Sequence, residues 1–184
     1  MQWIEAKPLA DAHGGELGVS RPGTLAAAIV TPQMGEPFTA ISVYGCWEAP
    51  HAMTSGKFIY ADASVHRLIS DLSVFVSKRA TRSILVAGDL NILYGYGERG
   101  DAYWAARYGT VFTRMKALGL SFIGPQAPAG RLAEPWPAEL PRTSRNVPTY
   151  HTKKQTPASC TRQLDFVFAT ASLASRCSVI ALRS

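Results

Sequence analysis

Two segments of helical character stand among segments of strand character, and this order is what most constrains the fold. Residues 60–78 carry apolar side chains at the spacing of one helical face, and so do residues 101–118. Asp101 suits the N-cap of the second helix, and Gly119 suits its C-terminal end. The apolar positions are Val65, Leu68, Ile69, Leu72, Phe75 and Val76 in the first helix, and Trp104, Tyr108, Val111, Phe112 and Met115 in the second.

The segments around these helices are typical of strands. They are residues 25–30 (LAAAIV), 38–45 (FTAISVYG), 83–89 (SILVAGD), 163–169 (QLDFVFA) and 177–182 (CSVIAL). The run TPQMGEP, rich in turn formers, joins the first two and predicts an antiparallel hairpin. Strands with two intervening helices, and hairpins on either side, predict a layered α+β fold with a mixed sheet. Residues 124–148, rich in Pro, Ala and Arg, are predicted to form a long loop.

Composition narrows the class of protein. With 184 residues, of which 47% are hydrophobic and 17% charged, the chain is expected to form one globular domain. Its net charge of +6 is compatible with a polyanionic partner such as nucleic acid. Because it has no apolar run of membrane-spanning length and no secretory signal pattern, we expect a cytoplasmic protein without a membrane partner. The oligomeric state is left open.

The segment GDLN at the end of the third predicted strand is the first candidate site. Asp89 and Asn91 lie two residues apart, so in an extended segment they would project from the same face. Hydrolysis of a phosphodiester needs a base for the attacking water and neutralisation of phosphoryl charge, often by a divalent metal that prefers oxygen ligands. Both residue types also favour turns, so a strand that simply ends in a turn is the alternative.

Further candidates follow along the chain. Asp165 alternates with Leu164 and Phe166, which predicts a carboxylate on the face opposite the apolar side chains; the alternative is the polar face of an edge strand. Tyr44 could donate a hydrogen bond to phosphate or only pack, and His151 could be an acid, a phosphate contact or a solvated loop histidine. The basic residues that could track a phosphate backbone, or be merely solvated, are Arg142, Arg145, Lys153, Lys154 and Arg162.

The order of these motifs resembles the endonuclease/exonuclease/phosphatase (DNase I-like) superfamily. The resemblance rests on the strand ending in Tyr44, the Gly-Asp-Leu-Asn box at 88–91, Pro-Thr-Tyr at 148–150 and Arg-Gln-Leu-Asp-Phe-Val-Phe at 162–168. It covers roughly residues 25 to 182. The resemblance implies a four-layered α/β/β/α sandwich of two mixed sheets, and a metal-dependent phosphodiester hydrolase using Mg²⁺ or Mn²⁺.

The resemblance also implies roles for single residues. Asp89 matches the residue that orients or deprotonates the attacking water, and Asn91 matches its partner at the phosphate; both are candidate metal ligands. Asp165 matches the residue that orients a catalytic histidine, and Tyr44 falls near the scissile phosphate. The candidate substrate-binding residues are Asn91, Thr149, Tyr150, His151 and Arg162.

Two features of the superfamily have no counterpart in this sequence. Its members carry a Gln-Glu box near the N-terminus, whereas Glu5 and Glu16 lie in no such box, and they end in Ser-Asp-His, whereas this chain reads VIALRS. The sequence therefore predicts one domain over residues 1–184 that lacks N- and C-terminal parts of the fold. We expect a nuclease acting on nucleic acid. The alternatives are a truncated or inactive member serving as a binding module, a small-molecule phosphatase, and an unrelated α+β protein.

Overall fold

The computed structural model describes residues 1–14, 16–48, 61–78 and 83–180. Its helices are α1 (Ala61–Lys78), α2 (Ala102–Ala117) and the short α3 (Ala171–Ala174). Its strands are β1 (Gln2–Ile4), β2 (Ala6–Pro8), β3 (Leu17–Val19), β4 (Leu25–Val30), β5 (Phe38–Tyr44), β6 (Ser83–Asp89), β7 (Leu120–Gly124) and β8 (Asp165–Thr170). Single 3-10 turns lie at Leu9–Asp11, Glu98–Gly100 and Pro157–Ser159.

A six-stranded mixed sheet forms the centre of the structure. Its strand order is β1-β4-β5-β6-β8-β7, and β2 pairs with β3 in a separate two-stranded sheet. Within the large sheet, β5 and β6 run parallel, and the other neighbours run antiparallel. A parallel pair needs a crossover connection, and α1 supplies it between β5 and β6.

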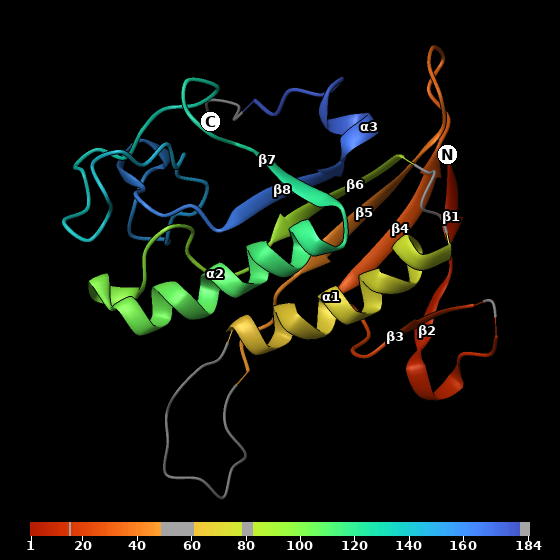
Figure 1. The fold of residues 1–184 in the computed structure, drawn as a ribbon. Coiled ribbons are helices and arrows are strands. Elements are labelled where there is room, and N and C mark those ends of the chain that lie inside the picture. The colour runs from red at the N-terminus through yellow and green to blue at the C-terminus, as the bar shows by residue number, and fades with distance from the viewer. Residues whose placement is uncertain (15, 49–60, 79–82, 181–184) are drawn as a thin grey trace, which may run out of the picture.

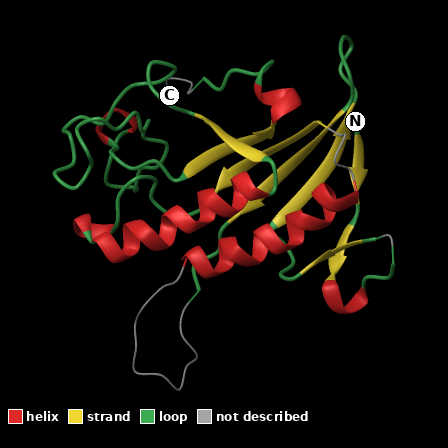
Figure 2. Ribbon diagram, in the orientation of Figure 1, coloured by secondary structure: helices red, strands yellow, loops and turns green. Residues whose placement is uncertain are grey.

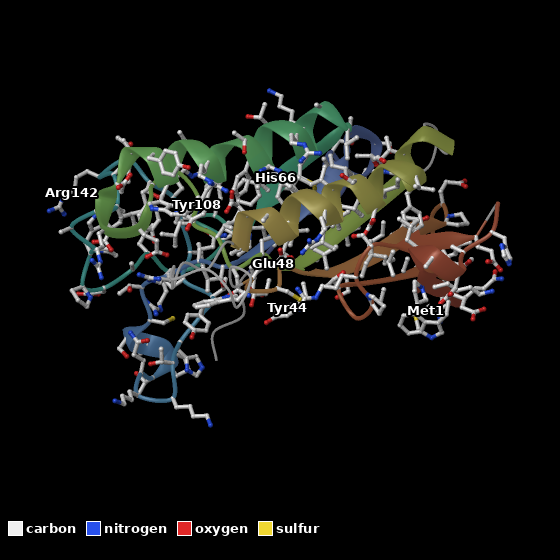
Figure 3. The ribbon with its side chains drawn as sticks, turned by 90° about the horizontal axis from the view of Figure 1, so that it is seen from below. Met1, Tyr44, Glu48, His66, Tyr108 and Arg142 are labelled. Atoms are coloured by element: carbon white, nitrogen blue, oxygen red, sulfur yellow. The ribbon has the colours of Figure 1, made fainter. Side chains whose placement is uncertain are left out.

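Helices α1 and α2 lie side by side across one face of this sheet (Figure 1). The row Ile41–Val86–Phe168, in register on β5, β6 and β8, is buried on that face. Phe112 of α2 contributes to the same core, with its ring centroid 5.2 Å from that of Phe166. The loops gather at the end of the sheet where β6 ends (Figure 2). The sheet face opposite α1 and α2 carries the other set of alternating side chains, which includes Tyr44 (Figure 3).

An ion pair joins the two long helices. The Nε and Nη2 atoms of Arg107 donate to Oδ2 of Asp62 at 2.8 and 2.6 Å. The guanidinium also lies over the rings of Tyr103 and Trp104, 5.7 and 5.3 Å from their centroids. Asp62 in the first turn of α1 is only 1% exposed, so Arg107 neutralises a buried charge as well as linking the helices.

The predicted elements are found with few exceptions. The α+β class, the mixed sheet, the hairpin of β4 and β5, both long helices, the cap at Asp101 and the long loop after Gly124 are all confirmed. Of the four expected layers, the described residues form the mixed sheet and its helix layer, together with the small second sheet. Among the described residues, no helix is long and apolar enough to cross a membrane.

Three differences concern the ends of the chain and the last strands. The prediction of a strand at 177–182 is wrong for residues 177–180, which have no strand hydrogen bonding, and 181–182 lie outside the described residues. Strand β8 begins at Asp165 instead of Gln163, because the amides of Leu164 and Asp165 donate to the hydroxyl of Thr149. The sequence pattern does not predict the short strands β1, β2, β3 and β7; most are three residues long, too short for a pattern.

Replacing Arg107 with Ala should destabilise the fold, because it leaves the buried Asp62 carboxylate without its cation. We expect a loss of about 3 kcal/mol in the free energy of unfolding, measured by urea denaturation. The matched control is Arg142→Ala, since Arg142 is exposed on the long loop and should change stability by less than about 0.5 kcal/mol. Adding Asp62→Asn to Arg107→Ala should recover part of the loss, and equal losses for Arg107→Ala and Arg142→Ala would contradict this account.

Candidate functional site

Three predicted residues lie in one row across adjacent strands. Tyr44 of β5 is in register with Asp89 of β6, and Asp89 is in register with Asp165 of β8. Residues in register point to the same face of a sheet, so the three side chains are neighbours. The face is the one opposite α1 and α2, and Tyr44 points away from the helices (Figure 3). Tyr44 is 45% exposed, whereas Asp89 and Asp165 are half-buried.

Gly88 allows the row to form. It has a φ of 157° and is in register with Val43, and a Cβ at position 88 would collide with the Val43 carbonyl oxygen. A side chain there would push β5 and β6 apart one residue before Tyr44 and Asp89. The glycine of the GDLN segment is therefore required by the close approach of two strands.

Asp89 and Asn91 are joined by a turn. Strand β6 ends at Asp89, and Asn91 has a left-handed φ of 52°. The Asn91 amide donates to Oδ1 of Asp89 at 2.8 Å, and its side-chain Nδ2 donates to the Gly45 carbonyl at 3.0 Å. The sequence predicts that the two side chains project from the same face of an extended segment. The turn at Asn91 shows that they do not. The turn-forming alternative is correct in geometry, and it leaves the Asp89 carboxylate on the sheet face beside Asp165.

Asp165 is positioned by residues on the far side of the long loop. Oγ1 of Thr149 accepts hydrogen bonds from the amides of Leu164 and Asp165, at 3.1 and 3.0 Å. Gln163, which sequence reasoning did not select, is 2% exposed; its Nε2 donates to the Pro125 carbonyl at 2.8 Å and its Oε1 accepts from the Val147 amide at 3.1 Å. The only feature of the sequence that points to Gln163 is its place at the start of an apolar strand. Thr149 therefore positions the start of β8, because its hydroxyl accepts hydrogen bonds from both amides.

The surroundings of Asp89 act on the pKa of its carboxyl in both directions, with a net rise. Partial burial raises the pKa of the Asp89 carboxyl, and the carboxylate of Asp165 opposite raises it further. Hydrogen bonds from Asn91 act in the opposite direction, because they stabilise the charged form. A carboxyl group with a raised pKa is a better base toward water than an ordinary aspartate.

The remaining predicted residues lie around this row. Arg162 pairs with Tyr150 in an isolated β-bridge, and its Nη2 lies 3.1 Å from Oε2 of Glu98 in an ion pair. Tyr150 is 41% exposed. His151 is exposed, and its ring Nδ1 lies 3.2 Å from the Thr152 carbonyl oxygen. Within the described residues, strand register brings together Tyr44, Asp89 and Asp165, and no hydrogen bond links His151 to either carboxylate.

The site contains side-chain oxygens of the kind that a divalent metal binds. Asp89 and Asp165 offer carboxylate oxygens in register, and Asn91 keeps its carboxamide oxygen because Nδ2 makes the bond to Gly45. Mg²⁺ is often held by one or two carboxylates together with water and substrate oxygens, and these residues fit such a site. Within residues 1–14, 16–48, 61–78 and 83–180 there is no cluster of three or more His, Cys, Asp or Glu side chains that could enclose a metal.

Comparisons with known proteins give a similarity of structure. No family model matches this chain, and no curated protein sequence matches it. The fold is similar to the crystal structure of beta toxin 275-280 from Staphylococcus aureus, with a TM-score of 0.44 and 13% sequence identity. The match covers 80% of this chain and 43% of the beta toxin chain, so this chain spans less than half the length of that protein.

Gly88→Ala tests the close strand approach. The added methyl group would collide with the Val43 carbonyl, and we expect a loss of about 3 kcal/mol or more in the free energy of unfolding. Gly109→Ala is the matched control, because Gly109 lies within α2 and a Cβ added there would have nothing within 4 Å. Alanine favours a helix, so that variant should gain up to about 1 kcal/mol. Urea denaturation measures both, and similar small changes in both variants would refute the role of Gly88.

The raised pKa of Asp89 gives a pH dependence with a definite sign. Between the ordinary value of 3.8 and the raised value, the folded state binds more protons than the unfolded state, so stability falls as the pH rises through this window. Asp89→Asn stays neutral and keeps an oxygen for the Asn91 amide. The variant should melt above wild type at about pH 7, and the difference should vanish at about pH 3. Asp11→Asn, at an exposed position, is the control; a stabilisation by Asp89→Asn that persists unchanged at low pH would disprove the prediction.

Proposed function

We propose that this chain is a metal-dependent phosphodiester hydrolase that acts on nucleic acid. The observation that carries the proposal is the row of Tyr44, Asp89 and Asp165 at one end of the sheet, with Asn91 tied to Asp89. A chance arrangement of turn-forming residues would not require two carboxylates in register on the same face. Such a pair is costly to bury unless a proton or a cation compensates the charge.

The contacts of the candidate site residues suggest what each one does during hydrolysis of the phosphodiester. Oδ1 of Asp89 accepts a hydrogen bond from the Asn91 amide. Because Oδ1 is engaged in this way, Oδ2 is the oxygen that takes a proton from the attacking water. The hydroxyl of Tyr44, exposed beside it, donates to a phosphoryl oxygen. Asp89, Asn91 and Asp165 are the residues that would hold Mg²⁺ or Mn²⁺, which when bound neutralises charge on the phosphate. Thr149 keeps Asp165 in register through its hydrogen bonds to the start of β8.

Charge favours nucleic acid over a small phosphoester. The net charge is +6, and Lys153 and Lys154 are exposed between Thr149 and Arg162. That segment extends from the sheet on the same side as Tyr44 (Figure 3). Basic side chains beside the carboxylate row would contact the phosphates that flank the scissile one. The proposal includes a cytoplasmic location, which fractionation of cells that express the tagged chain would test.

A non-catalytic binding module is the second candidate. It is favoured by the turn at Asp89–Asn91, because hydrogen bonds to Gly45 and within the turn give both side chains a structural role. In this candidate the basic segment binds nucleic acid without cleaving it. The two candidates differ in whether Asp89 is needed for turnover or only for stability.

Cleavage assays separate the candidates. With Mg²⁺ or Mn²⁺, the chain should cleave plasmid DNA, single-stranded DNA or RNA, and EDTA should stop the reaction. Asp89→Asn should lower the rate at least about 100-fold, the size of a general-base contribution, while Asp11→Asn should leave it unchanged. The Asp89→Asn variant should remain folded by circular dichroism. Retained binding of nucleic acid with no metal-dependent cleavage by wild type would favour the binding module, and preferential hydrolysis of inositol phosphates would point to a small-molecule phosphatase.

A further inference from the structure

A pocket of about 740 Å³ opens at the same end of the sheet as the carboxylate row. Its walls include Trp47 after β5, Asn91 after β6, Arg162 before β8, and Trp104 and Tyr108 on α2. Two of these residues form hydrogen bonds with residues of the candidate site. The Asn91 amide donates to Asp89, and the Arg162 carbonyl accepts from the amide of Thr149, the residue that positions Asp165. The pocket therefore adjoins the candidate site but lies toward the two long helices. Its size is in the range of cavities that bind small organic ligands.

Aromatic rings form a large part of the pocket wall. The centroids of Trp104 and Tyr108 are 5.9 Å apart at an interplanar angle of 35°. Trp47 is 57% exposed although it is a large apolar side chain. An exposed tryptophan that shares an open pocket with two further rings suits a planar ligand, because aromatic side chains stack on the faces of nucleobases.

The pocket wall carries two acidic and two basic side chains, Glu98, Asp101, Arg99 and Arg162. Glu98 forms the ion pair with Arg162, and Asp101 caps α2 by accepting from the amides of Tyr103 and Trp104. Both acidic side chains of the wall are thus occupied. Arg99 also lines the pocket, and no hydrogen bond or ion pair within the described part of the chain engages its guanidinium. Its backbone is held at a left-handed φ of 54°, which is unusual for arginine and is found at ligand sites.

We propose that this pocket binds a nucleotide, with the base against Trp47 and Trp104 and the phosphate at Arg99. The inference rests on the proposed function for its biological meaning: the pocket would hold one base of the strand whose phosphodiester lies at Asp89. It adds a subsite that selects an unstacked base next to the scissile phosphate. Binding of the base needs neither the metal nor the Asp89 carboxylate, so the pocket can be tested without turnover.

Isothermal titration calorimetry of the full chain with AMP, without metal, tests the proposal directly. AMP should bind saturably, and adenosine and inorganic phosphate should each bind at least about tenfold more weakly, because each lacks one half of the contacts. Trp47→Ala should weaken AMP binding about tenfold or more, the effect of losing a stacking ring. Arg99→Asn, which tolerates a left-handed backbone, should weaken AMP but not adenosine. Trp3→Ala is the matched control, because Trp3 is 68% exposed on β1 and outside the pocket wall.

The outcomes separate this proposal from the proposed function. Absence of saturable AMP binding by wild type would overturn the pocket, as would equal binding of inorganic phosphate or an unchanged affinity in Trp47→Ala. If AMP binds as expected while no nucleic acid is cleaved, the pocket stands and the hydrolase proposal fails. If nucleic acid is cleaved but Trp47→Ala changes neither AMP binding nor KM, the hydrolase stands and the pocket fails.

Discussion

The close pairing of β6 with β5 on one side and β8 on the other is the constraint on which the rest of the structure depends. At the end of β6 the backbone is held from both sides: the Gly45 amide donates to the Asp89 carbonyl at 2.7 Å, and the Leu90 amide donates to the Leu164 carbonyl at 2.9 Å. Gly88 lets the Val43 carbonyl approach where no side chain would fit. These contacts fix three strands in register at one level, and that register determines which side chains meet.

The same strand register aligns the core residues on one face of the sheet and the candidate site residues on the other. Val43, Gly88 and Phe166 form the row next to Tyr44, Asp89 and Asp165, and alternation sends the two rows to opposite faces. Packing of Phe166 against Phe112 of α2 therefore also holds Asp165 in place. A shift of β8 by one residue would bury Asp165 among the aromatic rings and expose Phe166, which is strongly unfavourable. The apolar core thus determines where the carboxylates can lie.

The sequence predicts the parts of this arrangement that depend on local pattern. Alternation along residues 163–169 places Asp165 opposite Phe166 and Phe168, and helical spacing identifies α1 and α2. What the sequence does not reveal depends on contacts between distant segments. The turn at Asn91 is closed by Gly45, and Gln163 is held by Pro125 and Val147; these partners lie 46, 38 and 16 residues away. The expectation of a strand at 177–182 rests on composition alone, and composition cannot supply a pairing partner for a strand.

Asp89 connects structure and chemistry through its two oxygens. One oxygen accepts the Asn91 amide and closes the turn, which favours the charged carboxylate. Burial and the charge of Asp165 act against it and raise the pKa of the Asp89 carboxyl. A residue used only as a turn former needs no second carboxylate beside it, since the repulsion costs stability. A proton or a metal ion would relieve this repulsion. The pairing of the two carboxylates in register is therefore the observation on which the proposed reactive site rests.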